Sequence, residues 1–319
     1  MNQAREHILT RLGMSNTPIS GDDLAAELGL TRAGVWKHIQ ILKKTGIAIE
    51  AQAGKGYVLN EDVFSAGLIK AKLSTQRIGK RIMILEETGS TNRDTMAEAE
   101  AGTPEGLVIF ANKQTGGKGR LGRTWHTMPE SLAASVLLRP ELPPEQVPQL
   151  SLLTAVALHD ALSCYCPDIR IKWPNDLLYH GAKVAGILTE MRAEPGRVHA
   201  VVLGFGINLA APADGWPTDI NKPATDLASI TATQVSKTDL AVAILHALDD
   251  WYDIYLRGGF APVHRAWWQA HAASGAKVSV YDGRNYIEGI ARALDNDGAL
   301  LLETASGTQR IIAGDLELI

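Results

Sequence analysis

The hydrophobic pattern changes twice along the 319 residues, and the changes divide the chain into three segments of different architecture. Apolar residues recur at helical spacing in the first segment. From about Leu68 short apolar runs alternate with helical patterns, and after Ala276 apolar and polar residues alternate between glycine-containing turns. A chain of this length exceeds the size at which one core usually stops growing. We therefore expect an α+β protein with three domains, at residues 1–65, 66–272 and 273–319.

Three short helices and a two-stranded ribbon are predicted in the first 65 residues. The helical segments are 4–12, 22–30 and 31–46, and the third carries an apolar stripe at i, i+4 and i+7. Residues 47–59 alternate weakly around a Gly-Lys-Gly tip, as a ribbon with a basic turn would. This order predicts a winged helix-turn-helix.

Positive charge is concentrated on the third helix and the ribbon tip, although the whole chain has a net charge of -4. Between Arg32 and Lys55 there are five cations and a single acid, Glu50. If the apolar stripe faces the core, the opposite face is free to contact phosphates and base edges. The pattern predicts DNA binding, and a solvated basic surface is the alternative. The candidate DNA-binding residues are Arg32, Ala33, Trp36, Lys37, Gln40, Lys43 and Lys55.

A mixed α/β domain is predicted for the central segment. Strands are expected at 81–86, 106–111, 133–138, 170–173, 184–189 and 198–204. Helices are expected at 149–164, 238–256 and 260–271. The last segment has hairpin signals at 282–283, 296–298 and 306–307, which predict a small β-barrel.

A glycine-rich basic loop follows the second predicted strand. Residues 114–123 contain four glycines and three cations, a composition suited to anions because glycine lets backbone N–H groups approach closely. The spacing does not match the Walker A loop of nucleotide hydrolases. Taken alone, the segment could equally be a mobile surface loop.

Three other polar segments accompany this loop. The sequence KWPND stands at 172–176, and KVAGILTE follows at 183–190. Upstream, TGSTN at 88–92 offers hydroxyls and an amide at a predicted strand-to-helix turn.

Together the four segments resemble the biotin–protein ligase family, and the amino-terminal domain resembles that of its bifunctional members, which also repress biotin synthesis genes. The resemblance implies a central domain related in fold to class II synthetase-like domains and an SH3-like carboxy-terminal barrel. It implies ATP-dependent activation of biotin to biotinyl-5′-AMP, with Mg²⁺, and transfer to a lysine of an acetyl-CoA carboxylase carrier subunit. It also implies operator DNA as a partner and a homodimer when the adenylate, acting as corepressor, is bound.

The resemblance also assigns residues to two subsites. The implied biotin-binding residues are Ser90, Thr91, Asn92, Gln114, Gly117, Lys118, Gly119, Arg120 and Lys183. The implied ATP- and adenylate-binding residues are Arg120, Arg123, Trp125, Lys172, Asn175, Asn208 and Trp216. Trp216 would belong to a loop that covers adenine, and a simple core position is its alternative.

The chemistry fits these residue types. A carboxylate must attack an α-phosphate, and preorganised cations such as Lys183 and Arg120 lower the cost of bringing two anions together. The acceptor lysine must lose a proton, and Asp176 is the candidate to orient or receive it, with metal binding as its rival role. We expect Lys183, Arg120 and Asp176 to be the catalytic residues. The scattered histidines and the lone Cys164 and Cys166 predict no zinc-type metal site.

The chain departs from the family's loop pattern, because Lys118 stands where arginine is usual and lysine cannot make a planar bidentate contact. This departure bears on how firmly the activated intermediate is retained.

Several alternatives stay open or are set aside. A lipoate–protein ligase and a biotin-sensing repressor without turnover are the rival functions. The Gly204-Phe205-Gly206 run begins like a dinucleotide fingerprint, but no helix pattern follows it, so we reject that interpretation. The amino terminus has no export signal, and no apolar run reaches the roughly 18 residues of a membrane span, so a cytoplasmic protein with no membrane partner is expected.

Overall fold

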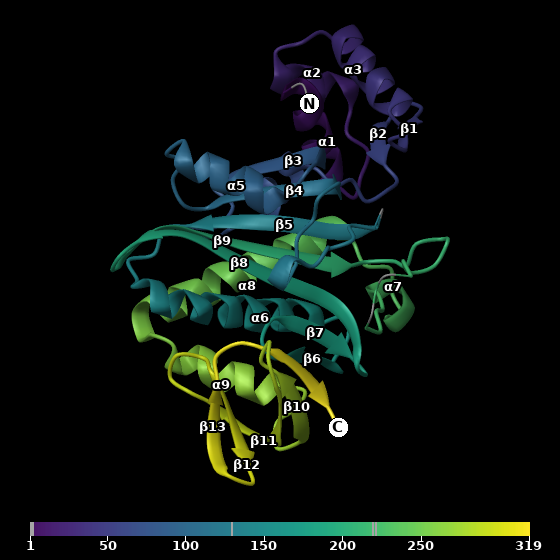
Figure 1. Ribbon diagram of the computed structural model, residues 1–319. Coiled ribbons are helices and arrows are strands. Elements are labelled where there is room, and N and C mark those ends of the chain that lie inside the picture. The colour runs from purple at the N-terminus through teal and green to yellow at the C-terminus, as the bar shows by residue number, and fades with distance from the viewer. Residues whose placement is uncertain (1–2, 129, 219, 221) are drawn as a thin grey trace. The chain divides into compact units, whose positions relative to one another are not determined.

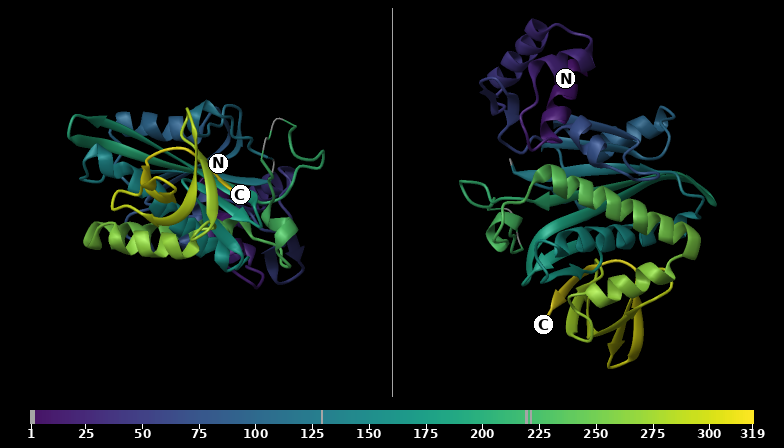
Figure 2. Two further views of the ribbon diagram at one scale, coloured as in Figure 1. Left: turned by 60° about the horizontal axis from the view of Figure 1, so that its bottom comes forward. Right: turned by 180° about the vertical axis from the view of Figure 1, so that it is seen from behind.

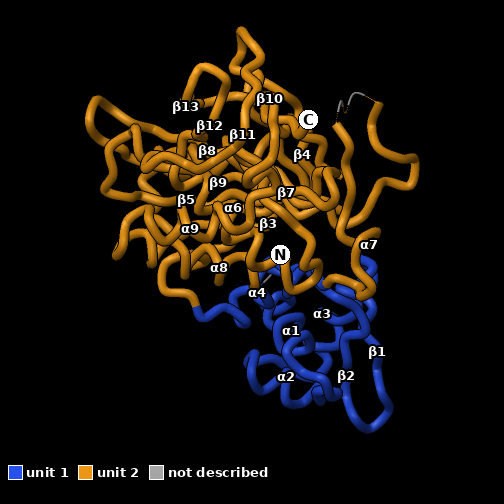
Figure 3. Tube along the Cα trace, turned by 90° about the horizontal axis from the view of Figure 1, so that it is seen from below, with its two compact units in different colours: residues 1–74, 236–242 blue, residues 75–235, 243–319 orange. Residues whose placement is uncertain are grey.

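The computed structural model describes residues 3–128, 130–218, 220 and 222–319. The chain divides into two compact units (Figure 3). One comprises residues 1–74 and 236–242, and the other comprises residues 75–235 and 243–319. The domain boundaries expected after residues 65 and 272 remain predictions.

The first unit is built on a trihelical core. Its helices are α1 (Gln3–Gly13), α2 (Gly21–Leu28), α3 (Arg32–Lys44) and α4 (Ala66–Lys72). Ser20 and Thr31 cap α2 and α3, since each side-chain oxygen accepts a hydrogen bond from the backbone N–H three residues later. The predicted stripe of α3, Val35, Ile39 and Leu42, is buried in one cluster with residues of α1 and α2.

The predicted ribbon of this unit is present. Strands β1 (Ile49–Gln52) and β2 (Gly56–Leu59) pair antiparallel, with Gln52 opposite Gly56. The tip therefore holds Gly54 and Lys55, and Gly54 has a positive φ of 72°. Helix, helix, recognition helix and ribbon occur in the predicted order of a winged helix-turn-helix.

The second unit contains a seven-stranded mixed sheet, which occupies the middle of the view in Figure 1. Its strands lie in the order β3-β4-β5-β9-β8-β7-β6, and only the β3–β4 pair is parallel. Their bounds are β3 (Arg81–Thr88), β4 (Leu107–Gln114), β5 (Ser131–Leu138), β6 (Ile169–Lys172), β7 (Asp176–Tyr179), β8 (Ala182–Glu194) and β9 (Arg197–Asn208). All six predicted strands are present, and β7 was not predicted.

Helices cover this sheet. Helix α5 (Thr91–Glu100) packs on β4, β5 and β9, and α6 (Val147–Ser163) packs on β6 to β9. Helix α9 (Ala261–Ala270) packs on α6, so that α6 is buried on nearly every side. Figure 2 shows the long helix α8 (Lys237–Gly258) running along the side of the sheet that Figure 1 hides. The short helices are α7 (Leu227–Ile230), η1 (Arg120–Gly122) and η2 (Pro144–Gln146).

A five-stranded antiparallel sheet ends the chain, where the small β-barrel was predicted. Its order is β13-β12-β11-β10-β14. The strands are β10 (Lys277–Tyr281), β11 (Tyr286–Leu294), β12 (Leu300–Thr304), β13 (Gly307–Ile311) and β14 (Asp315–Leu318). The three predicted turn signals lie between successive strands from β10 to β13, and the predicted fold class is confirmed in its three parts.

Within the described part of the chain, no helix combines the length and the apolar character that crossing a membrane requires.

Candidate functional site

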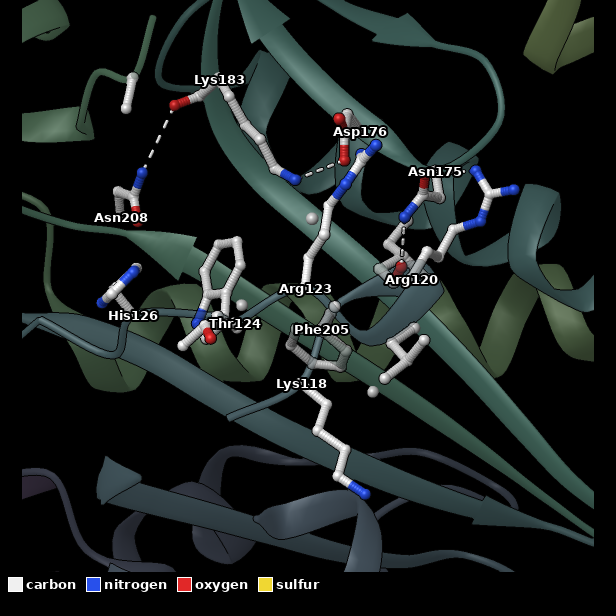
Figure 4. Close-up of a pocket in the computed structure, with 18 of the residues that line it drawn as sticks. Lys118, Arg120, Arg123, Thr124, His126, Asn175, Asp176, Lys183, Phe205 and Asn208 are labelled. Carbon is white, nitrogen blue, oxygen red and sulfur yellow. Dashed lines mark hydrogen bonds and ion pairs between the residues drawn. The ribbon is translucent and has the colours of Figure 1, made fainter. Parts of the chain in front are cut away.

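A cavity of about 410 Å³ in the second unit gathers the four polar segments singled out in the sequence (Figure 4). Fifteen of the predicted biotin-site, nucleotide-site and catalytic residues line it. They are Ser90, Thr91, Asn92, Gln114, Lys118, Gly119, Arg120, Arg123, Trp125, Lys172, Asn175, Asp176, Lys183, Asn208 and Trp216. Gly117 is not among the lining residues. The predicted DNA-binding residues all belong to the first unit.

A hydrogen-bonded network of uncharged side chains forms one end of the cavity, where α5 begins. The backbone N–H of Thr91 donates to Gln114 Oε1 at 2.8 Å, and Gln114 Nε2 donates to Thr127 Oγ1 at 3.0 Å. The buried Ser135 hydroxyl lies 2.6 Å from Asn92 Oδ1. These contacts fix polar groups in place before any ligand arrives.

The glycine-rich loop forms a tight turn at the cavity mouth. The N–H of Gly119 donates to the Arg123 carbonyl at 2.7 Å, and the backbones of Lys118 and Thr124 form an isolated antiparallel β-bridge. Leu121 at the turn has a φ of 56° and is largely exposed, so the loop carries strained backbone that packing does not cover. In Figure 4 the Lys118 side chain points away from Lys183 and Asp176.

Trp125 lies against a floor of glycines. A Cβ at Gly206 would come within 2.4 Å of the indole, and one at Gly186 within 3.1 Å. Gly117 lies against the backbone of the same residue, because its carbonyl accepts the Trp125 N–H at 3.0 Å and a Cβ there would meet the Trp125 carbonyl at 2.5 Å. The Lys183 ammonium lies 5.4 Å from the centre of the indole ring, in cation–π range.

Charged groups meet at another part of the cavity wall. Lys183 Nζ lies 2.6 Å from Asp176 Oδ1. Arg120 Nη1 donates to Asn175 Oδ1 at 3.3 Å, while Asn175 Nδ2 donates to the Ile187 carbonyl at 2.6 Å. Asn175 thus ties the arginine of the loop to strand β8.

The pKa values of two cations at this wall are lowered, chiefly by burial. The pKa of Lys172 falls below its usual value because burial penalises its charge and because Lys222 and Lys183 lie nearby, while Asp176 and Asp315 oppose the shift. Burial likewise lowers the pKa of Arg120, and Asp315 and Asp176 offset part of this effect. Crowded, partly desolvated cations of this kind favour an anionic ligand.

The carboxy-terminal sheet contributes to the same cavity. Asp315 pairs with the Arg123 guanidinium, and the Gly314 carbonyl accepts from Arg120 Nη1 at 3.4 Å. The hydrogen bond from Arg123 is the main reason that the pKa of Asp315 is lowered. The loop's two arginines are therefore held by residues nearly 200 positions downstream.

A second loop pairs with the backbone of Lys183. The Lys183 N–H donates to the Pro223 carbonyl at 2.8 Å, and its carbonyl accepts from the Thr225 N–H at 2.9 Å. The buried Asn208 donates to the Thr225 carbonyl at 3.0 Å. Trp216 in this loop is half-buried and lines the cavity, so it is not a simple core residue.

Comparison with known proteins agrees with this geometry. Residues 85–208 match the biotin/lipoate A/B protein ligase family, residues 4–58 an HTH domain, and residues 273–318 the biotin protein ligase C-terminal domain. The bifunctional ligase/repressor BirA of Bacillus spizizenii is 35% identical over 94% of both chains, and that of Bacillus subtilis is 34% identical over 95% of this chain and 94% of its own. The chain belongs to the bifunctional biotin protein ligase family.

A solved structure supports the family assignment at the level of the fold. Biotin protein ligase from Aquifex aeolicus, in complex with biotin and ATP, is 26% identical with a TM-score of 0.63. The match covers 75% of this chain and 99% of that one.

Sequence reasoning missed several residues of this biotin protein ligase site. Gly204 and Gly206 were set aside with a rejected dinucleotide motif, yet they form the floor under Asn92 and Trp125. Asp315 and Lys222 also line the cavity. Two glycines close together in an apolar strand indicate that another group approaches the backbone closely, and this pattern could have identified Gly204 and Gly206. Nothing near Asp315 in the sequence signals its role.

The DNA-binding candidates of this family member lie on one helix and the ribbon tip. Arg32, Ala33, Trp36, Lys37 and Lys55 are exposed, while Gln40 and Lys43 are half-buried. Arg32 is 3.5 Å from Asp22, a distance typical of a weak surface ion pair. The outward face of α3 therefore has the exposure that the recognition-helix hypothesis requires.

Proposed function

We propose that this protein activates biotin with ATP to form biotinyl-5′-AMP and transfers the biotin to a lysine of an acetyl-CoA carboxylase carrier subunit. The single observation that carries the proposal is the convergence of four separate segments on one cavity, which is lined both by uncharged hydrogen-bonding groups and by cations. An amphipathic carboxylic acid and a nucleotide fit such a lining.

The biotin ring belongs at the uncharged end in this proposal. Ser90, Thr91, Asn92 and Gln114 offer hydroxyl and amide groups to a ureido ring. Lys118, Gly119, Arg120 and Lys183 would direct its carboxylate toward the nucleotide. Gly117 acts indirectly, because it supports Trp125.

The nucleotide belongs at the charged end. Arg120, Arg123 and Lys172 offer cations to the phosphates, and Trp125 and Trp216 offer aromatic faces to the base. Asn175 and Asn208 orient Arg120 and the loop that follows residue 216.

The reaction would proceed in two displacements. A biotin carboxylate oxygen forms a bond to the α-phosphorus while the bond to the diphosphate oxygen breaks, and Lys183 and Arg120 offset the repulsion between the two anions. The acceptor lysine nitrogen then bonds to the acyl carbon, and AMP leaves. Asp176, whose Oδ1 lies 2.6 Å from Lys183 Nζ, would orient the amine or accept its proton.

Magnesium would enter with the nucleotide. Among the described residues no cluster of three histidine, cysteine or carboxylate side chains could hold a metal ion. Asp176 and Asp315 line the cavity, but each is paired with a cation. The ion would be held mainly by phosphate oxygens and water, with Asp176 as the candidate carboxylate beside it, and it would neutralise charge on the diphosphate.

Mass spectrometry tests the ligase activity. With ATP, biotin and a biotin-acceptor carrier domain, the acceptor should gain one biotin, and omission of ATP should prevent it. Lipoate in place of biotin separates this proposal from lipoate ligation. An acceptor that gains lipoate, or nothing, would refute the proposal, and bound biotin without transfer would identify a sensor without turnover.

We further propose that the adenylate is a corepressor. An ordered adenylate would stabilise the loop at 116–123, favour a two-fold dimer through an edge of the seven-stranded sheet, and present two α3 helices to a palindromic operator. A DNase footprint on a biotin-biosynthesis operator should appear or strengthen when biotin and ATP are added together. A footprint indifferent to both would disprove the coupling.

A further inference from the structure

A half-buried carboxylate lies behind the uncharged end of the cavity, and no step of the proposed reaction uses it. Glu190 is on β8, and its Oε2 accepts a hydrogen bond from Asn92 Nδ2 at 2.7 Å. Glu190 itself does not line the cavity. Asn92, which Glu190 contacts, does line the cavity, so Glu190 can act on the site through Asn92.

The carboxylate determines which way the Asn92 amide faces. The nitrogen has two hydrogens, and both have acceptors, one in Glu190 and the other in the Leu188 carbonyl at 3.1 Å. A flipped amide would set its oxygen against the Glu190 carboxylate, with two acceptors and no proton between them. The Asn92 oxygen is thus directed away from β8.

Gly204 makes this orientation possible. A Cβ at this position would lie 2.0 Å from Asn92 Oδ1, which is closer than any two such atoms approach. The strand β9 therefore needs glycine there, and the amide oxygen occupies the space that a side chain would fill.

The orientation of Asn92 fixes the next group in turn. Ser135 Oγ carries one proton and has two oxygen neighbours, Asn92 Oδ1 at 2.6 Å and Thr91 Oγ1 at 2.8 Å. Because Asn92 Oδ1 can only accept, it takes the Ser135 proton. The Thr91 hydroxyl proton points to Gln114 Oε1 at 3.1 Å, so the lone pairs of Thr91 Oγ1 stay available.

From this chain of hydrogen bonds we infer that Glu190 is a positioning residue that makes Thr91 Oγ1 a hydrogen-bond acceptor for the ureido N–H of biotin. The inference rests on the proposed function and adds to it the residue that sets the polarity of the ring site. If Glu190 is lost, the Asn92 amide keeps one of its two acceptors, the Leu188 carbonyl, and can more easily turn its nitrogen to Ser135. The Ser135 proton then turns to Thr91 Oγ1, where it occupies one of the two lone pairs that biotin could use.

The test compares biotin affinity and ATP kinetics in variants of the full chain. Glu190→Ala should weaken biotin binding, measured calorimetrically without ATP, by about tenfold, the effect of one lost hydrogen bond in a buried site. The KM for ATP should stay within about twofold. Glu190→Gln, whose amide oxygen can still accept from Asn92, should bind biotin within about twofold of wild type. Glu194→Ala on the same strand is the matched control, because that carboxylate is 75% exposed and its pair with His199 spans 3.3 Å.

A double-mutant cycle separates positioning from general stability. Thr91→Val removes the acceptor but keeps the side-chain shape, and Glu190→Ala should then weaken biotin binding no further. Additive effects, unchanged affinity in Glu190→Ala, or equal losses for biotin and ATP would overturn the inference. If Glu190→Ala does not fold, Glu190→Met takes its place in the test, because methionine keeps the length of the side chain. A wild-type protein that binds no biotin would instead refute the proposed function.

Discussion

Asp315, the first residue of β14, holds the guanidinium of Arg123 at the end of the glycine-rich loop, with Asp315 Oδ1 3.1 Å from Arg123 Nη1 and a second contact through Nη2. The pair joins the carboxy-terminal sheet to the cavity mouth. Asp315 is mostly buried, whereas about half of the Arg123 side chain is exposed. The sheet at the end of the chain is therefore part of the site.

Loss of this pair should loosen the loop. In Asp315→Asn the charge attraction is gone, and a partly exposed pair is worth about 1 kcal/mol, so release of biotinyl-5′-AMP should accelerate about fivefold. Quench-flow measurement of adenylate release gives this rate. Glu317→Gln on the same strand is the control, since its pair with Lys222 spans 3.4 Å and the glutamate is more exposed. Equal release rates in the two variants would show that the pair does not restrain the loop.

Local patterns predicted most elements, because their signals lie within a few residues. The stripe of Val35, Ile39 and Leu42 predicted the buried face of α3, and the long apolar runs predicted the central strands. The strand β7 was missed because it has four residues and begins at Asp176, inside a segment interpreted as a polar motif. Its strand geometry comes from pairing with β6 and β8.

The residues of the candidate site were predictable where they share a motif with their neighbours. Lys172, Asn175 and Asp176 stand together, and the resemblance assigned them together. Asp315 reaches the cavity through β-sheet pairing of distant segments, which no local pattern encodes. Gly206 was visible, but its meaning depends on Trp125, which lies 81 positions away and packs on it.

Gly206→Ala should damage the nucleotide end of the site. The new methyl group would lie about 2.4 Å from the Trp125 indole, so the ring must move. We expect the KM for ATP to rise at least about fivefold, because overpacking of this kind costs about 1–3 kcal/mol. Gly196→Asn is the control, since that turn glycine has open space around it and asparagine tolerates its positive φ of 78°. An unchanged KM for ATP in Gly206→Ala would argue against a nucleotide role for Trp125.

Lys118→Arg should retain the activated intermediate at least as long as the native protein does. Lys118 lines the cavity, but its side chain points away from Lys183 and Asp176, and arginine adds reach and a planar set of donors. Quench-flow measurement of adenylate release gives the comparison. Faster release from Lys118→Arg would count against a retaining role at this position.

His271 should make the protein less stable in acid. Its Nδ1 lies 3.0 Å from the Ile171 carbonyl, its ring stacks on Trp267, and burial lowers its pKa from the usual 6.5 to about 4. Because the folded pKa is depressed, the neutral form is favoured by folding, and this stability is complete above pH 6.5 and is lost as the pH falls toward 4. The loss should reach about 2–3 kcal/mol by pH 4.5.

Urea unfolding at pH 7.5 and pH 4.5 measures this loss. His271→Phe keeps an aromatic ring at the position and should show a smaller difference between the two pH values than wild type. His180→Phe is the control, because that histidine is 68% exposed. If His271→Phe and wild type lose the same free energy of unfolding, His271 does not titrate in the way its burial implies.

Lys37→Ala should weaken DNA binding without changing its sequence preference. Lys37 is exposed on the outward face of α3, two residues after the buried Val35, and a lysine there contributes one phosphate contact in the proposed complex. Each such contact adds about 0.9 to the slope of log affinity against log salt. The slope, measured by fluorescence anisotropy with operator and scrambled duplexes, should therefore fall by about one for both. Lys70→Ala, on α4 and outside the recognition helix and ribbon, should leave the slope unchanged. A loss confined to the operator duplex would instead assign Lys37 to base recognition.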